Sequence, residues 1–375
     1  MTATDPYDAL LLVSFGGPEG PSDVLAFLRN VTRGRGVPDE RLAEVAEHYH
    51  AFGGRSPIND QCRALLSAIR ADLAAHGVAL PVYWGNRNAE PYLGGVLEQM
   101  TAQGVRRAAC FVTSAYSSYS GCRQYRENLF DAVAATAGAP QLDKLRHYHN
   151  HPGFVQPFVD ATVAALATLP ADVRDGARLV FVTHSIPEAM AHGSGRSAST
   201  DGGAYVRQHL DVADQVAAGV RQVTGTGHGH DLVYCSRSGP VSTPWLEPDV
   251  NDHLTALHVQ RVPGVVVVPI GFVSDHMEVA FDLDTEAAQT AAGLGLPFAR
   301  AATPGTDVRF VAMVRDLLLE RAGAERDEVV RRAAVGILPP SWDVCPAGCC
   351  GNPREPERPA LCGEDSPLSA GGART

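Results

Sequence analysis

Four consecutive valines, residues 265 to 268, constrain the fold of this chain more than any other feature. An unbroken β-branched run is typical of a parallel strand that is buried on both faces. The run continues through Pro269 and Ile270 and stops at Gly271, where we expect the strand to end. In open α/β sheets, ligands bind at the carboxyl ends of the strands, so the residues after Gly271 are candidates for a functional site.

Strand-like and helix-like segments alternate along the chain, which predicts parallel sheets with helical crossovers. Further strands are expected at residues 9–15, 82–84, 108–113, 178–183 and 231–235, and helices at 61–75, 157–169 and 211–223. The predicted fold class is α/β, with two similar Rossmann-like domains that each contain a parallel sheet flanked by helices. We expect an N-terminal domain at 1–150, a C-terminal domain at 151–303, a helical segment at 304–340 that packs back, and a Cys-rich tail at 341–375.

Acidic residues follow the valine strand at spacings of three and four, which places them on one face of a helix: Asp275, Glu278, Asp282 and Glu286. Carboxylates at this edge of a sheet suit either a hard cation or the removal of protons. The alternative is that Asp275 and Glu278 form a capping box and that the later acids are simply solvated.

His184 stands directly after the predicted strand at 178–183, at the same edge of the second sheet. An imidazole there can accept a proton near neutral pH or bind a borderline cation, so we interpret His184 as a site residue. The other histidine clusters, at 48–50, 147–151 and 228–230, are expected to be surface loops.

The net charge of −11 over 375 residues argues against binding to nucleic acid and against docking on an anionic membrane. No apolar run reaches the roughly 18 residues that a membrane-spanning helix needs, so we expect no membrane insertion. No Lys or Arg precedes the apolar residues 9–13, so the N-terminal segment does not have the pattern of a signal peptide. These features predict a cytoplasmic protein.

Half of the eight cysteines lie in the Pro- and Gly-rich C-terminal segment: Cys345, Cys349, Cys350 and Cys362. In a cytoplasmic chain such a group indicates metal or redox chemistry more than structural disulfides.

Several segments, in this order along the chain, resemble the motifs of ferrochelatases: residues 14–18, 53–57, 182–187, 234–246 and 269–278. The last of these, Pro-Ile-Gly-Phe-Val-Ser-Asp-His-Met-Glu, is long enough to be specific. The resemblance covers about residues 8 to 320. It is strongest to the actinobacterial branch, through residues 31–38 and the cysteine-bearing tail.

The resemblance implies a lyase that inserts Fe2+ into a porphyrin while two pyrrole N–H protons leave. It implies that His184 takes up protons or binds iron, and that Glu278 is the carboxylate facing it. Asp275 and Asp282 would then continue a path for protons or iron toward solvent. A haem or iron carrier without chemistry is the alternative from a different functional class.

By the same resemblance, Ser56 and Tyr125 contact the porphyrin edge and Arg33 binds a propionate. Phe15 departs from family members that have Tyr or Met there as a possible iron donor. The polar region 33–50 fits coproporphyrin III, which carries four propionates, whereas enzymes for protoporphyrin IX usually have an apolar lip; protoporphyrin IX is the competing substrate. We expect a monomer.

For the tail, the resemblance implies a 2Fe-2S cluster, and four cysteine thiolates are a normal ligand set for it. Family members with the cluster often take one ligand from a helix near residue 157, where this chain has no cysteine. We therefore expect Cys345, Cys349, Cys350 and Cys362 to be the ligands. A cysteine from the body of the protein in place of one of them, or zinc on the same sulfurs, remains open.

Overall fold

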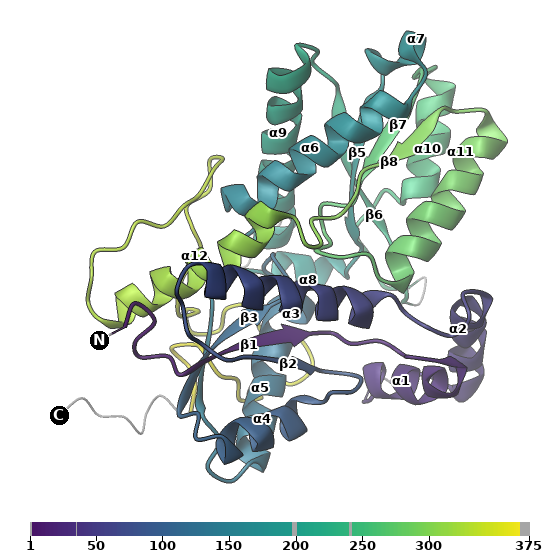
Figure 1. Cartoon of the computed structure of the whole chain (residues 1–375). Coiled ribbons are helices and arrows are strands. Elements are labelled where there is room, and N and C mark those ends of the chain that lie inside the picture. The colour runs from purple at the N-terminus through teal and green to yellow at the C-terminus, as the bar shows by residue number, and fades with distance from the viewer. Residues whose placement is uncertain (1, 35, 197–200, 240–241, 368–375) are drawn as a thin grey trace.

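Two four-stranded parallel sheets form the framework of the protein (Figure 1). The computed structural model describes residues 2–34, 36–196, 201–239 and 242–367. The predicted tail residues 368–375 therefore lie outside the described part of the chain. The strand order is β2-β1-β3-β4 in the first sheet and β6-β5-β7-β8 in the second, so the earliest strand of each half lies between the next two. This confirms the predicted α/β fold with two similar halves.

The N-terminal half contains strands β1 (Ala9–Ser14), β2 (Val82–Asn86), β3 (Arg107–Val112) and β4 (Gln141–Lys144). Its helices are α1 (Val24–Val31), α2 (Asp39–Ala51), α3 (Ile58–Ala75), α4 (Leu93–Ala102) and α5 (Gln124–Ala135), with single turns η1 (Pro21–Asp23) and η2 (Tyr119–Arg123). In Figure 1, α1 and α2 project from the side of this half.

The C-terminal half contains strands β5 (Arg178–His184), β6 (His230–Cys235), β7 (Val265–Val268) and β8 (Phe298–Arg300). Its helices are α6 (Pro152–Thr168), α7 (Ala171–Arg174), α8 (Glu188–His192), α9 (Gly203–Thr224), α10 (Val250–Val259), the π-helix η3 (Val279–Ala287) and α11 (Ala288–Leu294). Helix α12 (Val308–Glu325) packs against α3 and α6 and so joins the two halves. No helix among the described residues is both long and apolar enough to span a bilayer.

The central strands form where the sequence is most apolar. All six residues of β1 and all four of β7 are buried, as expected for strands covered by helices on both faces. Strand β7 ends at Val268, earlier than expected, because Pro269 has no N–H to donate to the ladder. The outer strands β4 and β8 were missed, because each is short and mixes charged with apolar residues, as edge strands do.

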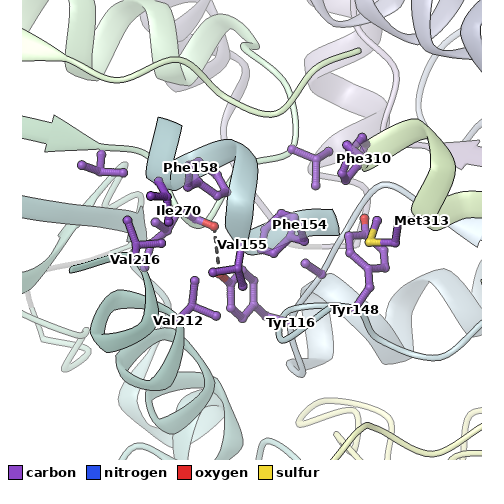
Figure 2. Packing of buried hydrophobic residues seen from close by; sticks show 14 of the residues in the cluster. Tyr116, Tyr148, Phe154, Val155, Phe158, Val212, Val216, Ile270, Phe310 and Met313 are labelled. Atoms are coloured by element: carbon purple, nitrogen blue, oxygen red, sulfur yellow. Dashed lines mark hydrogen bonds between the residues drawn. The ribbon is translucent and has the colours of Figure 1, made fainter. Parts of the chain in front are cut away.

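The largest apolar cluster lies where the two halves meet, and Figure 2 shows part of it. The ring of Phe154 lies 5.6 Å from that of Tyr148 and 6.3 Å from that of Phe310, so α6, α12 and the segment after β4 share one core. The Tyr116 hydroxyl donates to the carbonyl oxygen of Ile270 at 2.9 Å, which links the halves across this cluster.

The histidines at 147–151 belong to this buried region, so the expectation of a surface loop was wrong. His147, His149 and His151 are at most 5% exposed. Burial lowers the pKa of His149 to about 3 and that of His151 to about 4, so both are neutral at physiological pH. The Nδ1 atom of His151 accepts the Gly153 N–H at 3.0 Å and caps α6.

We expect Phe154→Ala to lower the free energy of unfolding by about 3–5 kcal/mol, because it removes a fully buried ring and leaves a cavity. Urea unfolding at equilibrium measures this. Val308→Ala is the control: Val308 is 79% exposed, so its replacement should change the free energy by less than about 0.5 kcal/mol. Equal effects of the two substitutions would contradict the role assigned to the aromatic cluster.

Candidate active site

His184 and Glu278 face each other at the carboxyl edge of the second sheet. His184 is the last residue of β5, and the loop after the neighbouring strand β7 brings Glu278 to it. The Nε2 atom of His184 lies 3.7 Å from Oε2 of Glu278. The Nδ1–H of His184 donates to the carbonyl oxygen of Ser185, which leaves Nε2 as the free nitrogen, able to accept a proton or bind a metal.

Three carboxylates line up along the π-helix η3 with a spacing of four residues: Glu278, Asp282 and Glu286. Short π-helical segments are frequent at functional sites. Asp282 is the least solvated of the three, and it accepts a hydrogen bond from the Ser236 hydroxyl. Burial, with the nearby charges of Glu278 and Glu286, raises the pKa of Asp282 to about 6, although the Ser236 hydrogen bond opposes the shift. Asp282 can therefore gain or lose a proton close to neutral pH.

Asp275 does not join this row, because its carboxylate is already bound. Its Oδ1 atom accepts from Nη1 of Arg300 and from Oγ1 of Thr303, both at 3.1 Å. The alternative of a capping box is also not observed. The start of η3 is capped instead by His276, whose Nδ1 accepts the N–H of Glu278 at 3.2 Å.

The N-terminal half provides the other expected site residues. Ser56 and Tyr125 are both 4% exposed, and Ser56 packs so closely on Gly17 that a Cβ on Gly17 would lie 2.7 Å from the Ser56 Cβ. Arg33 is exposed in the turn after α1 and makes no ion pair with another described residue. Reasoning from the sequence missed Arg87, whose guanidinium lies over the Tyr125 ring at 4.3 Å. Arg87 directly follows β2 at the carboxyl edge of the sheet, and this position in the sequence could have identified it as a site residue.

Helix α2 reaches across to η3 and contacts Phe281 at the edge of the acidic row. The imidazole of His48 stacks on the Phe281 ring with 4.4 Å between centroids and 12° between planes. Phe52, just after α2, packs edge-on against the same ring at 6.3 Å. The projecting helix of one half thus touches the acidic helix of the other.

A second candidate site lies where the tail packs on η2 and, through Cys350, on Gly195 of the C-terminal half. Four cysteines form a buried cluster there: Cys122, Cys345, Cys349 and Cys350. The sulfur atoms of Cys349 and Cys350 are 3.8 Å apart, and all four cysteines are free. Cys362 lies elsewhere: its Sγ accepts the N–H of Lys144 at 3.2 Å. The structure thus brings together three of the four expected tail cysteines, and Cys122 of η2 takes the place given to Cys362. The chain near residue 157 contributes none.

Among the four clustered cysteines, Cys345 is the one favoured as a thiolate, whereas the pKa values of Cys122, Cys349 and Cys350 are raised, chiefly by hydrogen bonds with their neighbouring thiols and by burial. Hydrogen bonds from Cys122 and Cys349, together with the charges of Lys144 and Arg126, hold the pKa of Cys345 well below its usual range, against the effect of burial. No set of three or more His, Cys, Asp or Glu side chains in the described ranges converges as a site for a metal ion. A 2Fe-2S cluster, however, divides four thiolates between two irons and does not gather them around one.

The tail is held by two arginines that are almost fully buried, Arg123 at the end of η2 and Arg126 in α5. Arg126 donates to the carbonyl oxygen of Leu361 at 2.5 Å and to Oδ1 of Asp365 at 3.1 Å. Arg123 donates to Oδ2 of Asp365 at 2.9 Å. These contacts explain how a segment with few apolar residues is ordered beside Cys122.

The two-lobed arrangement of parallel sheets, with a histidine and acids at the edge, is that of a chelatase. Among solved structures, the fold is similar to SirB from Bacillus subtilis with Fe3+, with a TM-score of 0.52, 11% sequence identity, and coverage of 86% of this chain and 99% of that one. Residues 7–322 match the family model Ferrochelatase. The chain belongs to the ferrochelatase family.

Relatives of known function support this assignment. The chain is 61% identical over 369 residues to the coproporphyrin III ferrochelatase of Streptomyces coelicolor, covering 97% of this chain and 98% of that protein. It is 59% identical over 362 residues to the protein of the same name from Frankia alni, covering 95% of this chain and 90% of that protein.

The raised pKa of Asp282 predicts a pH-dependent stability. Between its ordinary value of 3.8 and the native value of about 6, the native state binds more protons, so the stability of the wild type falls as pH rises through this window. Asp282→Asn removes this loss. The free energy of unfolding of the variant, relative to that of the wild type, should therefore be about 2 kcal/mol higher at pH 7.5 than at pH 4.

Urea unfolding of both proteins at pH 4 and pH 7.5 measures this difference. Glu98→Gln, on the exposed face of α4, is the control and should show no such change between the two pH values. A difference between Asp282→Asn and wild type that is the same at both pH values would refute the assignment.

Proposed function

We propose that this protein inserts ferrous iron into coproporphyrin III, which forms iron coproporphyrin III in haem biosynthesis. The observation that carries the proposal is the 3.7 Å approach of His184 Nε2 to the Glu278 carboxylate at the carboxyl edge of the sheet. The names of the relatives that cover almost the whole chain support the same reaction and substrate.

The reaction exchanges one Fe2+ for two protons on the porphyrin nitrogens. The free Nε2 of His184 is the group suited to accept a pyrrole proton, and the facing Glu278 stabilises the imidazolium that results. Glu278 can then take the proton from this imidazolium, and Asp282, with its pKa near neutrality, is suited to pass it toward solvent along η3, which frees His184 for the second pyrrole proton. Asp275 is the least suited of the four expected residues, because Arg300 already neutralises its carboxylate.

The N-terminal half is the proposed porphyrin side. Ser56 packs on Gly17, after β1, and Tyr125 packs under Arg87, after β2, so both lie near its carboxyl edge, where each is 4% exposed. Arg33 and Arg87 add positive charge without a carboxylate partner among the described residues. Guanidinium groups bind carboxylates well, so this wall suits a substrate with four propionates. Protoporphyrin IX, with two propionates and a less polar rim, is the alternative substrate. Cytoplasmic location, a monomeric state and the domain boundaries remain predictions.

The direct test is anaerobic insertion of ferrous iron, followed by visible absorption, with coproporphyrin III and protoporphyrin IX in parallel. We expect faster metallation of coproporphyrin III, and we expect His184→Ala and Glu278→Gln each to lower the rate by about 100-fold or more, since general acid–base groups contribute on that scale. Preference for protoporphyrin IX would overturn the substrate. Porphyrin binding without any insertion would favour the carrier alternative.

We propose further that Cys122, Cys345, Cys349 and Cys350 hold a 2Fe-2S cluster. The support is their shared burial, the absence of disulfides among them, and the lowered pKa of the Cys345 thiol beside Arg126 and Lys144. When bound, such a cluster supplies one-electron redox chemistry. The four cysteines themselves would tie the tail to η2 at the start of α5. Zinc on the same sulfurs is the alternative.

Cys122→Ser and Cys362→Ser form a matched pair that tests this ligand set. We expect Cys122→Ser to lose most of the visible absorption of the cluster and most of its iron and acid-labile sulfide, because Cys122 is one of the four clustered thiols. Cys362→Ser should retain them, because Cys362 bonds to the backbone of β4. The reverse pattern would favour the four tail cysteines as the ligand set. One zinc per chain without acid-labile sulfide would show that the site holds zinc and not an iron-sulfur cluster.

A further inference from the structure

Gln61 makes an unusual contact between the two halves. It lies in the first turn of α3, and its amide pairs with both backbone polar groups of Asp275 in the loop after β7. Nε2 of Gln61 donates to the Asp275 carbonyl oxygen at 2.7 Å, and Oε1 accepts the Asp275 N–H at 2.8 Å. Both distances are those of good hydrogen bonds, and the contact is half-buried.

The bound loop is the one that places Glu278. The Glu278 side chain is exposed, and the nearest ionisable groups are the ring nitrogens of His184 at 3.7 Å and His276 at 4.0 Å. No hydrogen bond among the described residues holds its carboxylate. The position of this carboxylate therefore depends on the backbone of the loop, which is fixed at Asp275 and capped by His276.

Asp275 is held from both sides. Its carboxylate binds Arg300 at the end of β8, within its own half, while its backbone binds Gln61 of the other half. Two further contacts cross to the same segment: Tyr116 to Ile270 and His48 to Phe281. The Gln61 contact, at Asp275, lies between these two along the segment.

We propose that Gln61 is a positioning residue, which fixes the Glu278 loop of the C-terminal half relative to the N-terminal half. His184 and Glu278 both belong to the C-terminal half, whereas Ser56 and Tyr125 belong to the N-terminal half. The Gln61 contact then helps to fix the distance from His184 and Glu278 to a porphyrin bound on the N-terminal half. This kinetic role depends on the proposed function, whereas the contact itself does not.

Gln61→Met tests the inference with little change in shape or helix propensity, because Met is nearly isosteric with Gln and cannot make either bond. In hydrogen exchange without substrate, the backbone of residues 273–279 should exchange faster in the variant. In the insertion assay, kcat should fall by about 10-fold with KM for porphyrin changed by less than about 2-fold, because a displaced reacting group slows the reaction without weakening binding.

Gln61→Glu is the second variant. A carboxylate still accepts the Asp275 N–H, but its second oxygen faces the Asp275 carbonyl oxygen, and two acceptors repel each other. The loss of kcat in Gln61→Glu should therefore be at least as large as in Gln61→Met. Gln103→Met is the matched control: Gln103 accepts the Tyr83 hydroxyl at 2.5 Å at the opposite edge of the first sheet, and its loss should leave both readouts unchanged.

The two readouts separate the possible failures. A wild type that inserts no iron while Gln61→Met speeds exchange in residues 273–279 would reject the proposed function and keep the contact. Wild-type kcat in Gln61→Met would overturn the positioning role. The thermal unfolding transition measures how much of each variant is folded. A fall in kcat no larger than the loss of folded protein would also overturn the positioning role.

Discussion

Burial of the central strands on both faces is the constraint on which the rest of this structure depends. A strand such as β7, with four buried valines, leaves no face for polar chemistry, so polar groups can only lie where the strand ends. In a parallel sheet, neighbouring strands end at the same edge. His184 at the end of β5 and Glu278 after β7 therefore meet because β5 and β7 are hydrogen-bonded neighbours.

The same constraint explains why the sequence predicted much of the fold and marked His184 and the acids after β7 as candidates, while their pairing came from the resemblance to ferrochelatases. Long β-branched runs mark buried strands, and a histidine or acid directly after such a run falls at the ligand edge. The short outer strands β4 and β8 carry no such signal, since edge strands are partly polar. The histidines at 147–151 were misjudged because a polar sequence can still be buried when its groups find hydrogen bonds or remain neutral.

What the sequence could not predict depends on contacts between distant segments. The carboxylate of Asp275 has helix-compatible spacing to Glu278, yet it is bound by Arg300, which lies 25 residues further along the chain. Cys362 is close in sequence to the clustered cysteines, whereas Cys122 precedes all of them by more than half the chain and still packs among them. Sequence spacing reports only local geometry. It therefore favoured Cys362 of the tail over Cys122, which the fold brings into contact with the other three cysteines.

Helix α5 connects the proposed porphyrin wall of the N-terminal half with the cysteine cluster. Tyr125 packs under Arg87 on the proposed porphyrin side, while the next residue, Arg126, binds the tail. Neighbouring residues on a helix point about 100° apart, so one rigid helix can serve both faces. Cys122, just before α5, is part of the cysteine cluster, so anything that orders that cluster also fixes the start of the helix that carries Tyr125. By holding Cys122 and Arg126, the described part of the tail thereby stabilises the helix that carries Tyr125, a residue of the proposed porphyrin wall.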